Sequence, residues 1–190
     1  AGYQFFKVFD EHQMEFVILA KGDSDDVYMV GKIASFQTQN LLVAYKERFD
    51  KDNFIKNLLL DNLLLVDIYN RSKKLHIETD AKRIVMIIET NLDKEENALE
   101  IVRGVIGTKP KEFVTAVDEK SVIIVKELEG EDTYDELCRY AKGIKEMLAG
   151  EGMPEARIAL GTIVNEIKDV SRSYKEAKMS LDVGKIFYSE

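Results

Sequence analysis

The stretch that decides the fold is RIVMIIE, residues Arg83–Glu89. Its uninterrupted apolar run between two charged residues is typical of a central strand that is buried on both faces. After this strand, helical and strand-like periodicities alternate to the end of the chain. The expected elements are a helix at Lys94–Ile106, strands at Glu112–Val117 and Ser121–Leu128, a helix at Asp132–Ala149, a strand at Arg157–Val164 and a helix at Ile167–Gly184. The order β-α-β-β-α-β-α predicts an α+β, ferredoxin-like domain with one extra helix.

The region before this domain is expected to hold a strand hairpin followed by helices. The hairpin lies within Gly2–Lys21 and turns at Asp10–Gln13. Helices are expected at Asp25–Arg48, Lys51–Leu60 and Leu63–Leu75. Because two strands alone are only marginally stable, the hairpin must either join strands encoded upstream or pack on the helix that follows it.

Composition narrows the class of protein. The 190 residues carry a formal net charge of −8 and a pI near 5.0, which argues against nucleic-acid binding by this segment, because such binding needs clustered Lys and Arg. The single cysteine, Cys138, excludes an internal disulfide, and we expect it to be a small apolar filler in a helix. No apolar run approaches the roughly 20 residues of a membrane span, so we expect no membrane contact and a cytoplasmic location. The chain begins at Ala1-Gly2, directly in strand-like sequence, which we interpret as a piece of a longer protein.

Apolar residues before the domain exceed what one buried face requires. The helix at Asp25–Arg48 is apolar on more than one side and must therefore be buried on more than one side. The clusters Leu58–Leu60 and Leu63–Val66 are too short for a membrane, which leaves two alternatives, ordinary core or the seam of a dimer. The residues that we expect at such a homodimer seam are Ile33, Phe36, Leu41, Leu59 and Leu63.

Side chains that could carry chemistry do not form a recognisable catalytic pattern. His12 and His76 have no Cys, Asp or His at metal-ligand spacing, and Ser171 lacks a nucleophile elbow or a partnered His. Tyr174 and Glu176 have the helical spacing of a packing aromatic and a surface carboxylate. We therefore predict no catalytic residue, no metal site and no bound cofactor.

The β-α-β-β-α-β order also resembles the architecture of GGDEF domains and nucleotide cyclases. Val117-Asp118-Glu119-Lys120-Ser121 lies where that family carries its Gly-Gly-Asp/Glu-Glu-Phe hairpin, and both glycines are absent. Without them the backbone cannot approach a guanine nucleotide closely. The first strand is followed by Glu89–Asp93, where Glu89 or Asp93 can in principle hold Mg²⁺ as cyclases do, although solvated acids are the simpler interpretation. The resemblance therefore implies a degenerate cyclase that is not an enzyme.

A broader resemblance links residues from about Phe49 to Ile186 to the carbohydrate-diacid and purine-catabolism regulators (the CdaR/PucR family). The carrying stretches are FIKNLL at Phe54–Leu59, NRSKKLHIE at Asn70–Glu78 and SYKEA at Ser173–Ala177. The residues that match the family motif are Arg71, Leu75, Ser173, Tyr174, Glu176 and Ala177. The sequence departs from the family at Ser72, where it often has Ala, at His76, where it often has Gly, and at Glu78, where it has Asp.

This resemblance implies a regulatory fragment of a bacterial transcription factor. Residues 1–48 then resemble the end of a GAF- or PAS-like sensor with its signalling helix, residues 49–80 form a helical linker, and residues 81–190 form the GGDEF-like domain. An effector of unknown identity acts on the sensor, a homodimer relays the signal, and DNA is bound only through a C-terminal helix-turn-helix domain that this sequence lacks. The alternative is a receptor for a nucleotide or a small acid, in which Glu89 contributes to the site.

Overall fold

The computed structural model describes residues 2–10, 12–24, 26–90, 98–107, 109, 111–130 and 132–187, with side chains described to Gly184. The chain consists of two compact units, which we call unit 1 (Ala1–Lys51) and unit 2 (Asp52–Glu190). The functional division into sensor, linker and GGDEF-like domain remains a prediction.

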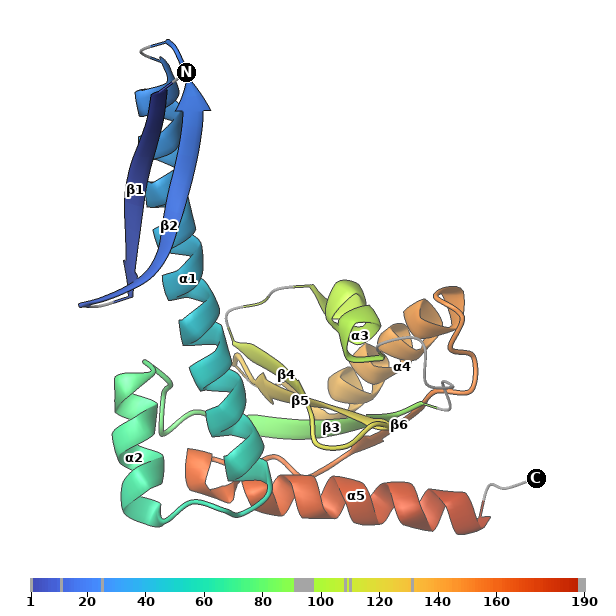
Figure 1. The fold of residues 1–190 in the computed structure, drawn as a ribbon. Coiled ribbons are helices and arrows are strands. Elements are labelled where there is room, and N and C mark those ends of the chain that lie inside the picture. Colours follow the sequence, from blue (N-terminus) through green and yellow to red (C-terminus); the bar gives the residue numbers. More distant parts are fainter. Residues whose placement is uncertain are drawn as a thin grey trace. The chain divides into compact units, whose positions relative to one another are not determined.

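Unit 1 is a strand hairpin packed on a helix (Figure 1). Strands β1 (Gly2–Asp10) and β2 (Gln13–Gly22) pair antiparallel, and helix α1 (Asp26–Leu59) follows them. The Phe6 ring approaches Gly31 so closely that a Cβ at residue 31 would overlap it. Of the two arrangements that the sequence allowed for the hairpin, unit 1 therefore shows packing on the following helix.

Helix α1 is longer than predicted, because the break that we expected near Arg48 does not exist. The predicted helix at Lys51–Leu60 is the continuation of the first one, so the prediction of two helices was wrong. Residues 44–60 contain neither Gly nor Pro, and nothing in the backbone stops the helix there. Lys51 Nζ also lies 2.7 Å from Glu47 Oε1, an i,i+4 ion pair that spans the expected break.

Unit 2 is built around a four-stranded antiparallel sheet. Its strands are β3 (Arg83–Glu89), β4 (Glu112–Ala116), β5 (Ser121–Glu127) and β6 (Arg157–Leu160), in the spatial order β4-β5-β3-β6. In this order β3, the first strand of unit 2, lies between β6 and the hairpin β4–β5. This is the strand order of the ferredoxin-like fold, and it confirms the predicted fold class.

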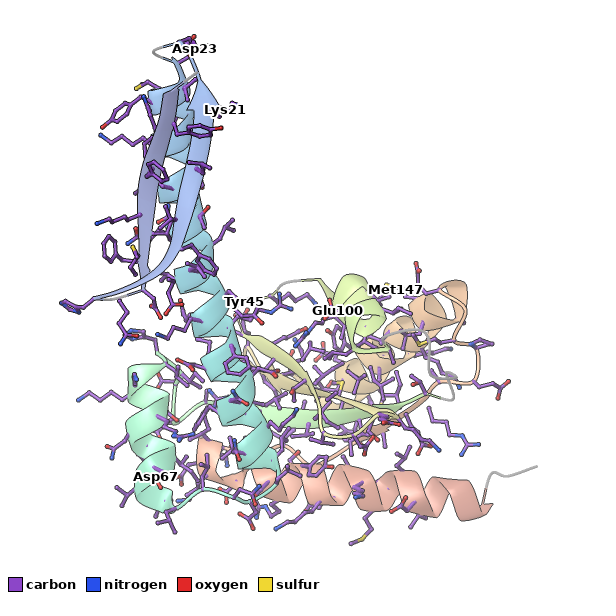
Figure 2. All side chains as sticks on the ribbon, viewed as in Figure 1. Lys21, Asp23, Tyr45, Asp67, Glu100 and Met147 are labelled. Atoms are coloured by element: carbon purple, nitrogen blue, oxygen red, sulfur yellow. The ribbon has the colours of Figure 1, made fainter. Side chains whose placement is uncertain are left out.

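Helices cover both faces of this sheet (Figure 1). Helices α3 (Ala98–Ile106) and α4 (Tyr134–Gly150) lie on one face, where they pack on Met86 and its strand neighbours. The opposite face is covered by α2 (Leu65–Lys74), α5 (Val170–Phe187) and the end of α1, together with the short 3₁₀ turn Ile167–Asp169. Figure 2 shows side chains filling the space on both sides of the sheet. The side chains of residues 83–88 are all buried, as the apolar run predicted.

Capping interactions explain where helix α4 begins and where helix α2 ends. Helix α4 begins after Thr133, whose hydroxyl accepts from the Glu136 N–H at 3.3 Å while the Glu136 carboxylate accepts from the Thr133 N–H at 2.9 Å. Helix α2 ends in a Schellman turn, in which the Ile77 N–H donates to the Ser72 carbonyl and the His76 N–H to the Lys73 carbonyl. His76 has a φ of 55°, the left-handed conformation that glycine usually provides at this position.

Strand β6 ends at Leu160, four residues before the predicted end of the strand. Gly161 lies against Ser173 of α5, where a Cβ would overlap the Ser173 carbonyl. The Gly161 N–H still donates to the Val85 carbonyl, but the Val85 N–H donates to the Ser173 hydroxyl, so regular pairing ends at this residue. Val164 returns to the sheet as an isolated bridge to Arg83. Among the described residues, no helix combines the length and the apolar character that crossing a membrane requires.

Candidate functional site

The turn between β4 and β5 is closed by a side chain. Asp118 Oδ1 accepts hydrogen bonds from the backbone N–H groups of Lys120 at 2.9 Å and Ser121 at 2.7 Å. Such an Asx turn satisfies the donors locally and holds the turn without glycine. The Lys120 carbonyl accepts from the Thr90 N–H at 3.0 Å, which ties the turn to the end of β3.

A cavity of about 410 Å³ lies beside this turn. It is bounded by the turn itself, by the end of β3 and by one side of α5. Its lining contains four carboxylates, two lysines and four uncharged residues. The carboxylates are Glu89, Asp118, Glu119 and Asp182, the lysines are Lys120 and Lys178, and the uncharged residues are Ser121, Tyr174, Ile87 and Leu181. The structure thus brings four of the five predicted hairpin residues and Glu89 together, whereas Val117 packs against the core and Asp93 lies outside the described residues.

The charges and the phenol of this cavity limit what it can hold. Burial, and secondly the negative charge of Asp118, raise the pKa of the Tyr174 phenol. The phenol therefore stays protonated at neutral pH and remains a hydrogen-bond donor. Because carboxylates outnumber lysines in the lining, the cavity opposes a polyphosphate that brings no cations of its own.

The motif SYKEA (Ser173–Ala177) attaches α5 to the sheet through hydrogen bonds and buried packing contacts. Ser173 is fully buried, and its hydroxyl accepts from the Val85 N–H at 3.1 Å and donates to the Thr162 carbonyl at 2.7 Å. This hydroxyl accepts the Val85 N–H at the residue where the regular pairing of β6 with β3 ends. Ala177 is also fully buried, and Glu176 accepts a hydrogen bond from the Thr162 hydroxyl.

The other motif residues lie on or beside α2. Arg71 is exposed, and Leu75 is buried at the end of the helix. Ser72, at a position where the CdaR/PucR regulators often have alanine, is buried and donates to the Ile68 carbonyl at 2.7 Å, so its hydroxyl is satisfied within the helix. These positions therefore build and terminate a helix.

The five predicted seam residues fall into two groups. Ile33, Phe36 and Leu41 are exposed on α1 within unit 1, at 57%, 64% and 69% of their surface. Leu59 is fully buried in the core of unit 2, and Leu63 packs partly against the same core. Leu59 and Leu63 therefore have contacts within their own chain, and the seam remains a prediction that concerns the exposed residues Ile33, Phe36 and Leu41.

Sequence reasoning missed a second cavity, of about 510 Å³, at the β6 edge of the sheet. It is lined by α4, β6 and α5 and includes Lys142, Lys145, Arg157 and Cys138. Cys138 is exposed, so the prediction of an apolar filler was wrong. The helical spacing of Lys142 and Lys145 is a signal in the sequence, but only the fold brings Arg157 beside them.

Within the described part of the chain, no three His, Cys, Asp or Glu side chains are arranged to hold a metal ion. His12 is exposed in the turn between β1 and β2, and His76 is exposed at the end of α2.

Comparison with known proteins gives one family and one solved structure. The sequence profile of the GGDEF-like domain matches residues 62–183. The crystal structure of a DGC protein from Thermotoga maritima aligns with a TM-score of 0.39 and 12% sequence identity, and the alignment covers 61% of this chain and 87% of that chain. No curated protein matches the chain.

Proposed function

The chain belongs to the GGDEF-like domain family through residues 62–183, and on that premise we propose that it is a non-catalytic regulatory part of a larger, cytoplasmic signalling protein. The specific role that we propose is that of a CdaR/PucR-type transcription regulator. In this role the chain forms a homodimer, receives an effector signal from a sensor domain, and passes it to a DNA-binding domain that lies outside this sequence.

The observation that carries the non-catalytic assignment is the closed turn at Asp118. A glycine-rich hairpin can offer its backbone N–H groups to a phosphate, because no side chain occupies the approach. In this chain the N–H groups of Lys120 and Ser121 already donate to the Asp118 carboxylate. A nucleotide phosphate would have to displace that carboxylate and lie beside its negative charge. The acidic lining of the adjacent cavity adds to this opposition.

The test of this assignment is a cyclase assay on the full chain. We expect incubation with GTP and Mg²⁺ to release no pyrophosphate and form no cyclic dinucleotide above a protein-free blank. An active diguanylate cyclase assayed in parallel shows that the assay detects turnover. Product formation in proportion to the concentration of this chain would contradict the proposal.

The exposed apolar stripe on α1 supports the homodimer. Gly31 faces the hairpin and serves as the reference direction on α1. With a rotation of 100° per residue, Ile33, Phe36 and Leu41 lie at angles between about 140° and 280° from Gly31 around the helix axis. They therefore form a stripe on the side that the hairpin does not cover. Exposed apolar stripes of this kind mark association surfaces.

Light scattering between 1 and 100 µM tests the homodimer. We expect twice the chain mass for the parent and the single-chain mass for Phe36→Glu, because a buried unpaired carboxylate opposes association. Met147→Glu, at an exposed apolar position on α4, is the matched control and should stay dimeric. A monomer throughout the range would remove the physical basis of the relay.

The DNA-binding role is tested by reading the parent gene beyond Glu190. We expect a helix-turn-helix pattern soon after this residue. A stop codon directly after Glu190 would contradict the transcription-factor role and leave only the regulatory domain.

A second candidate function is supported by the cavity beside the closed turn. Its volume of about 410 Å³ suits a small-molecule ligand, which allows a receptor for a nucleotide or a small acid. Titration calorimetry with GTP or a cyclic dinucleotide, in the presence of Mg²⁺, would then show saturable binding that Glu89→Ala weakens. A flat titration for both ligands would contradict the nucleotide part of this candidate.

A further inference from the structure

The groove at the β6 edge lies between helices on opposite faces of the sheet. Lys142 and Lys145 line it from α4, and Ser180 and Gly184 line it from α5. Strand β6 forms its floor, and within the described residues no further strand pairs with the outer side of β6. The two helices therefore flank an open strand edge.

The register of β6 shows which backbone groups face this groove. The Gly161 N–H donates to the Val85 carbonyl at 2.8 Å, and the pairing continues with Ala159 opposite Ile87. In an antiparallel ladder, hydrogen-bonded pairs alternate with pairs whose backbone groups point to the other side. Ile158 and Leu160 therefore direct their N–H and C=O groups away from β3, toward the groove.

The side chains around this edge give the groove a positive charge. Its lining contains Lys142, Lys145 and Arg157 and no carboxylate. None of these three cations forms an ion pair with any residue that the structure describes. The chain as a whole has a net charge of −8, so a lining with three cations and no carboxylate departs from its average surface. Arg157 lies opposite Glu89 in the ladder, which leaves Lys142 and Lys145 as the main positive charges of the groove.

We propose that this groove binds an extended acidic peptide segment of a partner protein, which adds to the sheet as a strand beside β6. Two outward-facing residues on β6 offer the alternating donors and acceptors that an extended backbone matches, whereas a small carboxylate would use only the cations. The volume of about 510 Å³ is also large enough for a few peptide residues.

The two walls of the groove predict an alternating sequence for the peptide. Side chains of a strand point to opposite faces in turn. One set would face α4, where Lys142 and Lys145 favour carboxylates, and the other would face α5, where Leu181 and Gly184 leave space for small apolar groups. The inference is independent of the proposed function, because the closed turn at Asp118 is not part of the groove.

The probe for this inference is a fluorescein-labelled peptide of alternating Glu and Val, eight residues long. We expect saturable binding to the full chain in fluorescence anisotropy, with a Kd on the order of 10–100 µM for so short an edge. The double variant Lys142→Glu/Lys145→Glu should weaken binding at least about tenfold, through loss of charge complementarity. The control variant is Lys73→Glu, at an exposed position on α2 outside the groove. It changes the net charge by half as much as the double variant and should leave the Kd of the peptide unchanged.

Two further measurements separate strand addition from charge attraction. A peptide of the same sequence, N-methylated at alternate residues, keeps its charge but loses backbone donors, and we expect it to bind at least about tenfold more weakly. Cys138 lines the groove and is the chain's single cysteine, so its reaction with a thiol reagent reports occupancy. We expect saturating peptide to slow this reaction about fivefold or more.

Several results would overturn the inference. Equal binding of the parent and N-methylated peptides would show that no strand is added. Displacement of the peptide by millimolar glutarate, together with equal binding of the N-methylated form, would identify a small-carboxylate site instead. Self-association of the chain that is lost in Lys142→Glu/Lys145→Glu would assign the groove to a second copy, and absence of peptide binding at 1 mM would exclude the proposed partner class.

Discussion

Unit 1 and unit 2 bury their apolar residues to very different extents. In unit 1, Val8 is the one large apolar side chain that is fully buried among the described residues, and most of the large apolar side chains on the hairpin and on α1 are exposed. In unit 2, the sheet is sandwiched between two buried clusters, one on each face. Figure 2 shows Tyr45 on α1, which is one of the exposed large side chains of unit 1.

The difference indicates how each unit obtains its stability. Burying apolar surface contributes roughly 25 cal/mol per Å², so unit 2 has the driving force to fold from its own residues. A hairpin of two strands with one helix leaves much of its apolar surface in water and is only marginally stable. We therefore expect unit 1 to depend on association, whereas unit 2 does not.

Hydrogen exchange gives the largest contrast. The amides of β2 should exchange about 1000-fold faster than those of β5 in dilute protein, which corresponds to about 4 kcal/mol in the free energy of opening. Raising the protein concentration should slow exchange in β2 and leave β5 unchanged, because only unit 1 gains from association. Equal protection of the two strands at micromolar concentration would break the comparison.

A core deletion tests the same contrast by mutation. Ile124→Ala removes a fully buried side chain from unit 2 and should lower the free energy of unfolding by about 3 kcal/mol, through lost burial and the remaining cavity. Leu41→Ala at an exposed position of unit 1 should change the stability of the monomer by less than about 0.5 kcal/mol. Urea denaturation at low protein concentration measures both. Similar losses for the two variants would show that Leu41 is buried in the chain itself.

Substituting a glycine that lies at a close contact in each unit tests how easily the neighbouring atoms of that unit can move. Gly161→Ala places a Cβ against the Ser173 backbone in unit 2 and should cost about 2–3 kcal/mol, because neither backbone can move easily. Gly31→Ala places one against the Phe6 ring in unit 1 and should cost about 1 kcal/mol, because a side chain at the edge of a small core can rotate away. Gly104→Ala, which meets no neighbouring atom, should be neutral or stabilising. Thermal unfolding ranks the three, and a greater loss at residue 31 than at residue 161 would reverse the comparison.

The smallest effect concerns the end of α2 in unit 2. His76→Gly should raise the free energy of unfolding by about 0.5–1 kcal/mol, because glycine adopts the positive φ of this position without steric strain. Lys73→Gly within the same helix should lower it by about 1 kcal/mol. Urea unfolding of both variants checks the sign, and destabilisation by His76→Gly would show that the imidazole makes a contact that outweighs the strain.

The predictable parts of the fold are those governed by local pattern. The apolar run at Arg83–Glu89 predicted a central strand with both its bounds. The continuity of α1 was not predictable from polarity alone, because charged residues such as Asp50 and Asp52 suggest a loop. In the helix Asp50 is exposed, whereas Asp52 is half-buried and forms an ion pair with Arg103. The early end of β6 depends on Gly161 meeting Ser173, and these two residues are brought together only by the fold.

The candidate site was predictable in position and not in chemistry. The strand patterns on either side of Asp118–Lys120 located the turn, but the sequence did not reveal that Asp118 would close it with two hydrogen bonds. The groove at β6 was missed, because Lys142 and Arg157 lie on different elements and become neighbours only when the sheet forms. Patterns within one element were therefore visible in the sequence, whereas pairings between elements were not.

The Asp118 turn also has an evolutionary consequence. Replacing Asp118 by glycine removes both hydrogen bonds that hold the turn, at a cost of about 1–3 kcal/mol, and by itself supplies neither the second glycine nor a catalytic carboxylate. This step toward a glycine-containing hairpin thus lowers stability before a nucleotide site is complete. Selection acts on one substitution at a time, so we expect the stability that the Asp118 turn provides to disfavour this step.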